Sequence, residues 1–207
     1  IKKINESSNI PVIKHLEGIC HIYVDKDANI KIAKKVIYNS KMRRPSICGA
    51  TETLLIDKRL IKKVPELLQQ LKEANCEIRG DNKICSLDSD FKKARAKDWD
   101  TEYLDKIISV KIVDGIDSAI EHITKHSSNH TESIITENVK TCKKFFKEID
   151  SAIVLQNAST QYADGGEFGF GAEIGISTDK LHVRGPVGAE HLTSFKYLVK
   201  GTGQVRP

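Results

Sequence analysis

Short runs of β-branched residues alternate with helix-like segments along most of the chain, and this alternation limits the folds open to it. Residues 19–24 read Ile-Cys-His-Ile-Tyr-Val, a strand pattern that Asp25 ends. Residues 28–41 carry apolar side chains at near-helical spacing, which predicts a helix capped from Asp27. Strands and helices continue to alternate up to residue 156, so we expect an α/β sheet with helices on its faces.

The remaining predicted elements follow the same pattern. We expect further strands at 10–13, 53–56, 107–113, 133–136 and 152–155, and further helices at 60–74, 116–126 and 139–149. Pro65 must lie in the first turn of its helix or begin a second helix, because proline lacks the backbone donor that a helix interior needs.

The alternation stops after residue 157. Residues 164–175 contain five glycines, which predicts a loop whose backbone adopts unusual angles or approaches another group closely. Residues 192–205 form a polar, strand-prone tail with no helix after them to cover it. A lone late strand is an exposed edge unless another chain pairs with it, so the tail predicts an oligomerisation strand.

Composition and charge exclude several classes of protein. The net charge of +5 is modest, acidic residues are interspersed with basic ones, and aromatic residues make up only 6%, so we expect no nucleic-acid partner. No apolar run approaches the roughly 18–20 residues of a membrane span, and the first residues lack the apolar region of a signal peptide. Five cysteines without repeated spacing indicate reduced thiols, which predicts a cytoplasmic protein. The lack of a membrane-length apolar run predicts no membrane contact.

Cys48 is the strongest candidate nucleophile. It lies in a short predicted loop in which Pro45 stops the preceding helix and Gly49 leaves the backbone open beside the sulfur. Arg43 and Arg44 are close enough in sequence to lower the pKa of a thiol. The alternative is that Cys48 is simply a small buried residue near a strand start. The other four cysteines are interpreted as structural: Cys20, Cys76, Cys85 and Cys142.

The spacing of possible ligands does not indicate a metal site. Cys20 and His21 are neighbours on a strand and therefore point to opposite faces. His122 and His126 are four apart on a helix but lack the His-Glu-x-x-His order and a third ligand. Residues 169–175 come close to a dinucleotide fingerprint without the strand–turn–helix unit that it requires. We predict neither a metal nor a phosphate cradle of this kind.

Several collinear stretches carry more specific motifs. They include Arg44-Pro45-x-x-Cys48 and the segments at 18–25, 52–55, 101–104, 129–132, 150–152, 157–160, 168–178 and 181–188. Together they resemble the gamma-glutamyl phosphate reductase family (glutamate-5-semialdehyde dehydrogenase) of the aldehyde dehydrogenase superfamily. The resemblance covers nearly the whole chain, from about residue 10 to residue 206.

The resemblance implies an aldehyde-dehydrogenase-like catalytic domain with a C-terminal oligomerisation strand. Residues 1–25 would be a remnant of the nucleotide-binding domain and the crossover from it, and residues 26–160 the catalytic α/β domain. Residues 161–207 would be a glycine-rich interface loop and an oligomerisation tail that pairs in a homodimer. Most of the nucleotide-binding domain would then be missing from this chain.

The resemblance also implies the chemistry. The Cys48 thiolate would attack gamma-glutamyl phosphate and expel phosphate, and a hydride from NADPH would reduce the thioester to glutamate 5-semialdehyde in proline biosynthesis. The Cys48 backbone N–H would supply half of an oxyanion hole. Glu102 matches a position that reaches the nicotinamide ribose, although its local sequence alone suggests a surface acid. His130 and Asn157 would be polar groups of the substrate pocket.

Two positions depart from the family pattern. Gly49 stands where the family usually has Asn, and Gln161 where it usually has Arg, a side chain that binds carboxylate or phosphate bidentately. Three readings therefore remain open. The chain is a catalytic fragment that is inactive alone, a degenerate remnant that serves as a dimerising structural module, or a cofactor-free thiol hydrolase with His130 or His182 as base.

Overall fold

A seven-stranded sheet forms the centre of the computed structural model, which describes residues 1–206. The strand order is β4-β3-β5-β2-β1-β6-β7, and every neighbouring pair is parallel. The strands are β1 (Cys20–Val24), β2 (Thr51–Asp57), β3 (Glu77–Gly80), β4 (Lys92–Lys93), β5 (Ile107–Val113), β6 (Thr131–Ile135) and β7 (Ile153–Gln156). The predicted α/β class is confirmed.

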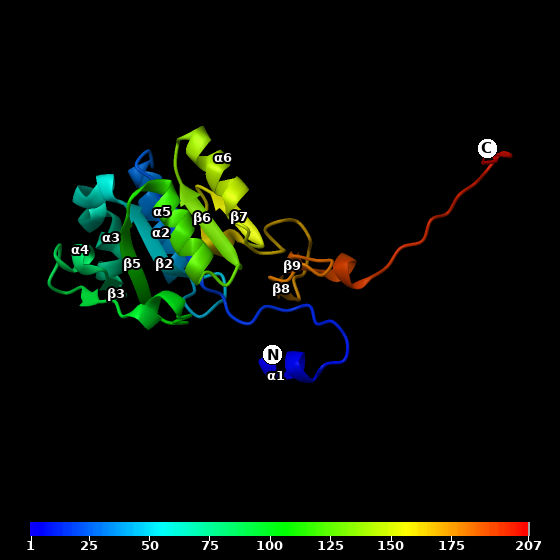
Figure 1. The fold of residues 1–207 in the computed structure, drawn as a ribbon, viewed down its shortest axis with the longest axis horizontal. Coiled ribbons are helices and arrows are strands. Elements are labelled where there is room, and N and C mark those ends of the chain that lie inside the picture. Colours follow the sequence, from blue (N-terminus) through cyan, green and yellow to red (C-terminus); the bar gives the residue numbers. More distant parts are fainter. Residues whose placement is uncertain (207) are drawn as a thin grey trace.

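Helices cover both faces of this sheet (Figure 1). One face packs against α2 (Ile30–Met42), α3 (Val64–Glu73) and the short α4 (Asn82–Cys85), and the other against α5 (Gly115–His126) and α6 (Val139–Glu148). Side chains alternate along each strand as a pleated strand requires. Ile22 and Val24 enter the α2–α3 core, whereas Tyr23 enters the α5–α6 core. The two apolar layers thus fix the register of the central strands.

The remaining elements are short. An N-terminal helix α1 (Lys2–Ser7) precedes an irregular segment that leads into β1, and β8 (Gly175–Ser177) pairs antiparallel with β9 (Gly185–Val187). The 3-10 turns are η1 (Lys58–Lys63), η2 (Ala96–Asp100), η3 (Thr160–Tyr162) and η4 (Ala189–Leu192). No helix within residues 1–206 has both the length and the apolar character needed to cross a bilayer.

Local sequence explains where the helices begin. The Asn29 side-chain oxygen accepts hydrogen bonds from the backbone N–H groups of Lys31 (3.0 Å) and Ile32 (3.3 Å), so Asn29 caps α2. The prediction of Asp27 as the cap was wrong, because this carboxylate instead accepts from Asn138 at 2.9 Å. Pro65 lies in the first turn of α3, where its missing N–H costs no helical hydrogen bond.

Two predicted strands are unpaired in this single chain. Residues 10–13 have no secondary structure, and just after them the Lys14 carbonyl accepts a backbone hydrogen bond from Thr178, the residue after β8 (3.2 Å). Residues 193–206 extend away from the sheet and form no strand within the described chain (Figure 1). A strand needs a neighbouring backbone, and neither segment has one within this single chain. The exposed apolar residues of this C-terminal tail include Phe195, Tyr197, Leu198 and Val199.

Candidate active site

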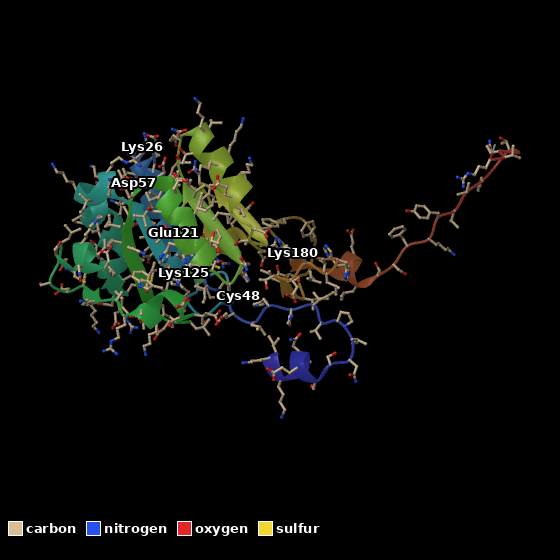
Figure 2. All side chains as sticks on the ribbon, in the orientation of Figure 1. Lys26, Cys48, Asp57, Glu121, Lys125 and Lys180 are labelled. Carbon is tan, nitrogen blue, oxygen red and sulfur yellow. The ribbon has the colours of Figure 1, made fainter. Side chains whose placement is uncertain are left out.

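Three of the four predicted site residues lie at one edge of the sheet. Since all seven strands are parallel, their amino ends share an edge, and Cys48, Glu102 and His130 precede β2, β5 and β6. Asn157 follows β7 and so lies at the carboxyl edge. Figure 2 shows the same separation, with Asp57 at the end of β2 far from Cys48. Open α/β sheets usually bind ligands at the carboxyl edge, so this arrangement is unusual.

The Cys48 loop is packed against the start of β1. A side-chain carbon added at Gly18 would lie 2.0 Å from the Cys48 carbonyl oxygen, so only glycine fits there. The Cys20 thiol donates to the same oxygen at 3.2 Å. A turn bond from Ala50 N–H to the Ile47 carbonyl (2.9 Å) closes the loop from the other side. The position of Cys48 therefore depends on the sequence that begins β1.

Two imidazoles flank the Cys48 thiol. The candidate ligand atoms of His15, Cys48 and His130 all lie within 4.8 Å of one another, and the two rings meet edge to face with centroids 5.2 Å apart. The sequence analysis identified His130 and missed His15. No local pattern marks His15, because it reaches Cys48 only through the pairing of β1 with β2 and β6.

Hydrogen bonds orient both rings. The Nδ1 of His15 lies 2.7 Å from the Ile176 carbonyl, which can only accept, so this nitrogen carries the proton. The Nδ1 of His130 lies 2.9 Å from the Thr131 hydroxyl. His130 is fully buried, and its Nε2 has no hydrogen-bond partner within residues 1–206. Burial, together with the nearby His15, lowers the pKa of His130 to about 4, so this ring is neutral at pH 7.

The electrostatic surroundings of Cys48 favour the thiol over the thiolate. Burial raises the pKa of Cys48 to about 11, and the carboxylates of Glu102 and Glu173 add to this rise. The backbone N–H groups of Cys48 and Gly49 oppose it. Neither Arg43 nor Arg44 is among the main groups that act on the pKa of Cys48, and the Arg43 guanidinium lies beside Gln161 (3.4 Å).

Glu102 is not a free surface acid. It is half-buried, and its Oε1 accepts a hydrogen bond from the Gly18 backbone N–H at 2.8 Å. Two residues later, Leu104 has a left-handed backbone (φ 53°), and its N–H approaches the Glu52 carboxylate at 3.4 Å. Glu52 in turn forms a fully buried ion pair with Lys41 (2.6 Å), and burial raises the pKa of Glu52 to about 7. This ion pair supports the segment that presents Glu102.

The side chains of Asn157 and Gln161 are already engaged by the protein. Asn157 accepts from the Thr136 N–H (3.0 Å) and donates to the Thr136 carbonyl (3.1 Å), which ties the turn after β7 to the end of β6. Gln161 is buried and donates to the carbonyls of Ser40 (2.9 Å) and Arg44 (3.3 Å). Both amides thus have structural partners, and a role for Asn157 in binding substrate stays a prediction.

Comparison with known proteins identifies relatives of this chain. No protein-family model matches the chain. It is 55% identical to the gamma-glutamyl phosphate reductase of Rhodopseudomonas palustris and 57% identical to that of Rhizobium etli. These alignments include the whole of this chain but only 48% and 49% of the two relatives. The chain thus spans about half the length of the curated relatives it matches.

Solved structures agree with this assignment. The gamma-glutamyl phosphate reductase of Thermotoga maritima superposes with a TM-score of 0.93 at 46% identity, covering all of this chain and 50% of that one. An acetylating aldehyde dehydrogenase from Geobacillus thermoglucosidasius superposes with a TM-score of 0.76 over 99% of this chain and 55% of that one. At 19% identity the second match shows the fold alone. Along its whole length, this chain is therefore homologous to about half of a gamma-glutamyl phosphate reductase, with the aldehyde dehydrogenase-like fold.

Proposed function

We propose that this chain is the thiol-bearing half of a gamma-glutamyl phosphate reductase and that Cys48 forms a thioester with the substrate. The observation that carries this proposal is the convergence of a thiol, two imidazoles and a carboxylate at the amino edge of the sheet. The relatives that match the whole chain at 54–57% identity are named for this reaction, which supports the same substrate.

The proposed covalent step needs only residues of this chain. The Cys48 thiolate attacks the acyl carbon of gamma-glutamyl phosphate, the S–C bond forms, and phosphate leaves with the electrons of the broken C–O bond. The thiol must first lose its proton. His130 is a weak base at pH 7 because its pKa is lowered to about 4, so we assign proton removal to His15, the other imidazole beside Cys48.

Glu102 supports the proposed use of NADPH. When bound, NADPH would supply the hydride that converts the thioester to the aldehyde. Gly18 occupies only Oε1 of Glu102, and Oε2 has no hydrogen-bond partner within residues 1–206. A carboxylate oxygen left free in this way can accept a hydrogen bond from a ribose hydroxyl. Most of the nucleotide-binding surface would come from the half of the enzyme that this chain does not span.

We further propose that the enzyme is a cytoplasmic homodimer. The five cysteines are free thiols, as a reducing compartment allows. Residues 193–206 expose apolar side chains and an unpaired backbone, which a second copy could cover by strand pairing.

Acyl transfer can be tested without any nicotinamide. The chain, incubated at pH 8 with acetyl phosphate as a stable acyl phosphate, should acquire a single acetyl group on Cys48, located by peptide mass spectrometry. Cys48→Ser should abolish the modification. Cys85→Ser should not, although Cys85 is also a half-exposed thiol. A folded chain whose Cys48 stays unmodified would instead support a non-catalytic, dimerising module.

The charge of Glu102 should suppress the reactivity of Cys48. Glu102→Gln keeps an oxygen for the Gly18 N–H but removes one charge that raises the pKa of Cys48. Because more thiolate is then present below the pKa of about 11, iodoacetamide at pH 8 should label Cys48 about threefold faster or more. In the parent chain and in the Glu102 variant, the labelling rate should rise with pH towards the pKa of Cys48.

The matched control for that variant is Glu121→Gln. Glu121 is exposed on α5, and its replacement removes the same formal charge without touching the site. Equal labelling rates at Cys48 in the parent chain, the Glu102 variant and the Glu121 variant would show that Glu102 does not act on the thiol.

The C-terminal tail should carry the dimer contact. Sedimentation equilibrium at high micromolar concentration should give a dimer for the whole chain and a monomer for a chain that ends at residue 192. A full-length variant with Ser at positions 195, 197, 198 and 199 should also be monomeric, because the four exposed apolar side chains are lost. A monomeric parent chain would refute this assignment.

A further inference from the structure

Three potential metal ligands converge at the amino edge of the sheet, from segments far apart in the sequence. His15 lies ahead of β1, Cys48 ahead of β2 and His130 ahead of β6, and their ligand atoms lie within 4.8 Å of one another. Zinc binds thiolate sulfur at about 2.3 Å and imidazole nitrogen at about 2.0–2.1 Å. Closing the three atoms around one ion therefore requires movements of about 1 Å, which side-chain rotation can supply.

The hydrogen bonds of the two rings suit them to this task. Protein histidines that bind metals usually engage their second ring nitrogen with an oxygen, which fixes the tautomer and the ring orientation. His15 is held in this way by the Ile176 carbonyl. The Thr131 hydroxyl lies 2.9 Å from the Nδ1 of His130 and accepts its proton in the tautomer that leaves Nε2 free. In each ring Nε2 is then left to bind an ion. The Nε2 of His130 is buried without a hydrogen-bond partner in the described chain, which a bound cation would supply.

The charges around the thiol also favour a cation. The carboxylates of Glu102 and Glu173 both act on Cys48. Glu102 is held by the Gly18 N–H and Glu173 by the Gly165 N–H, each at 2.8 Å. Both therefore keep fixed positions near the sulfur. Two carboxylates held beside the three ligands would attract a divalent cation.

We propose that His15, Cys48 and His130 bind a thiophilic divalent cation such as Zn²⁺ or Cd²⁺, with water at the fourth position, and that the ion masks the Cys48 thiol. The metal takes the place of the thiol proton, which is released to solvent, and no electron is transferred. Binding depends only on this geometry. The further consequence, that the ion blocks acyl transfer, rests on the function proposed above.

Co²⁺ provides a direct test on the tag-free chain. Titration should produce a thiolate-to-cobalt absorption band that saturates at one ion per chain and disappears when Zn²⁺ is added. Cys48→Ser should abolish the band. His15→Ala should weaken Co²⁺ binding about tenfold or more, since His15 is half-exposed and its loss leaves the core intact. His182→Ala, which removes an exposed histidine elsewhere, should leave the titration unchanged.

Protection of the thiol gives a second readout. Zn²⁺ should slow iodoacetamide labelling of Cys48 in the parent chain and fail to do so in His15→Ala. A cobalt band that persists in Cys48→Ser, or unprotected labelling of Cys48 at saturating Zn²⁺, would overturn the proposal. A chain that binds Co²⁺ through Cys48 but is not acylated by acetyl phosphate would refute the proposed function and leave the metal site standing.

Discussion

The contact between Gly18 and the Cys48 carbonyl is the constraint on which the site depends. A side-chain carbon at Gly18 would lie only 2.0 Å from that oxygen, so the two backbones are in direct contact and only glycine fits. The Cys20 thiol bonds to the same carbonyl, and the Gly18 N–H bonds to Glu102. The starts of β1, β2 and β5 are thereby linked through one glycine, which places the thiol and the carboxylate beside each other.

The structure accommodates Gly49 and Gln161, the two positions expected to depart from the family pattern. A side-chain carbon at Gly49 would lie 3.3 Å from the Thr160 carbonyl, so this buried position has little room for a larger residue. Gln161 uses its amide to bond the carbonyls of Ser40 and Arg44 and holds the end of α2.

The sequence predicted the sheet better than the site. Long strands were found because several residues share one period, and β5 has the bounds that its alternation predicts. The strands β3, β4, β8 and β9 have two to four residues each, too few to show a period. Cys48 was identifiable from its loop. His15 was not, because only the strand order brings it to the thiol. The C-terminal tail was predicted to pair as a strand with a second chain, and the single chain that the structure describes contains no such partner strand.

Transfer of an acetyl group from acetyl phosphate to Cys48 in Gly18→Ala tests the central claim most directly. The matched variant is Gly175→Ala, where an added carbon meets nothing within 4 Å. If contact with Gly18 positions the thiol, the Gly18 variant should lose about tenfold or more in rate while the Gly175 variant keeps the parent rate. Parent-like acylation of Gly18→Ala would contradict the account, because Cys48 would then hold its reactive position without that contact.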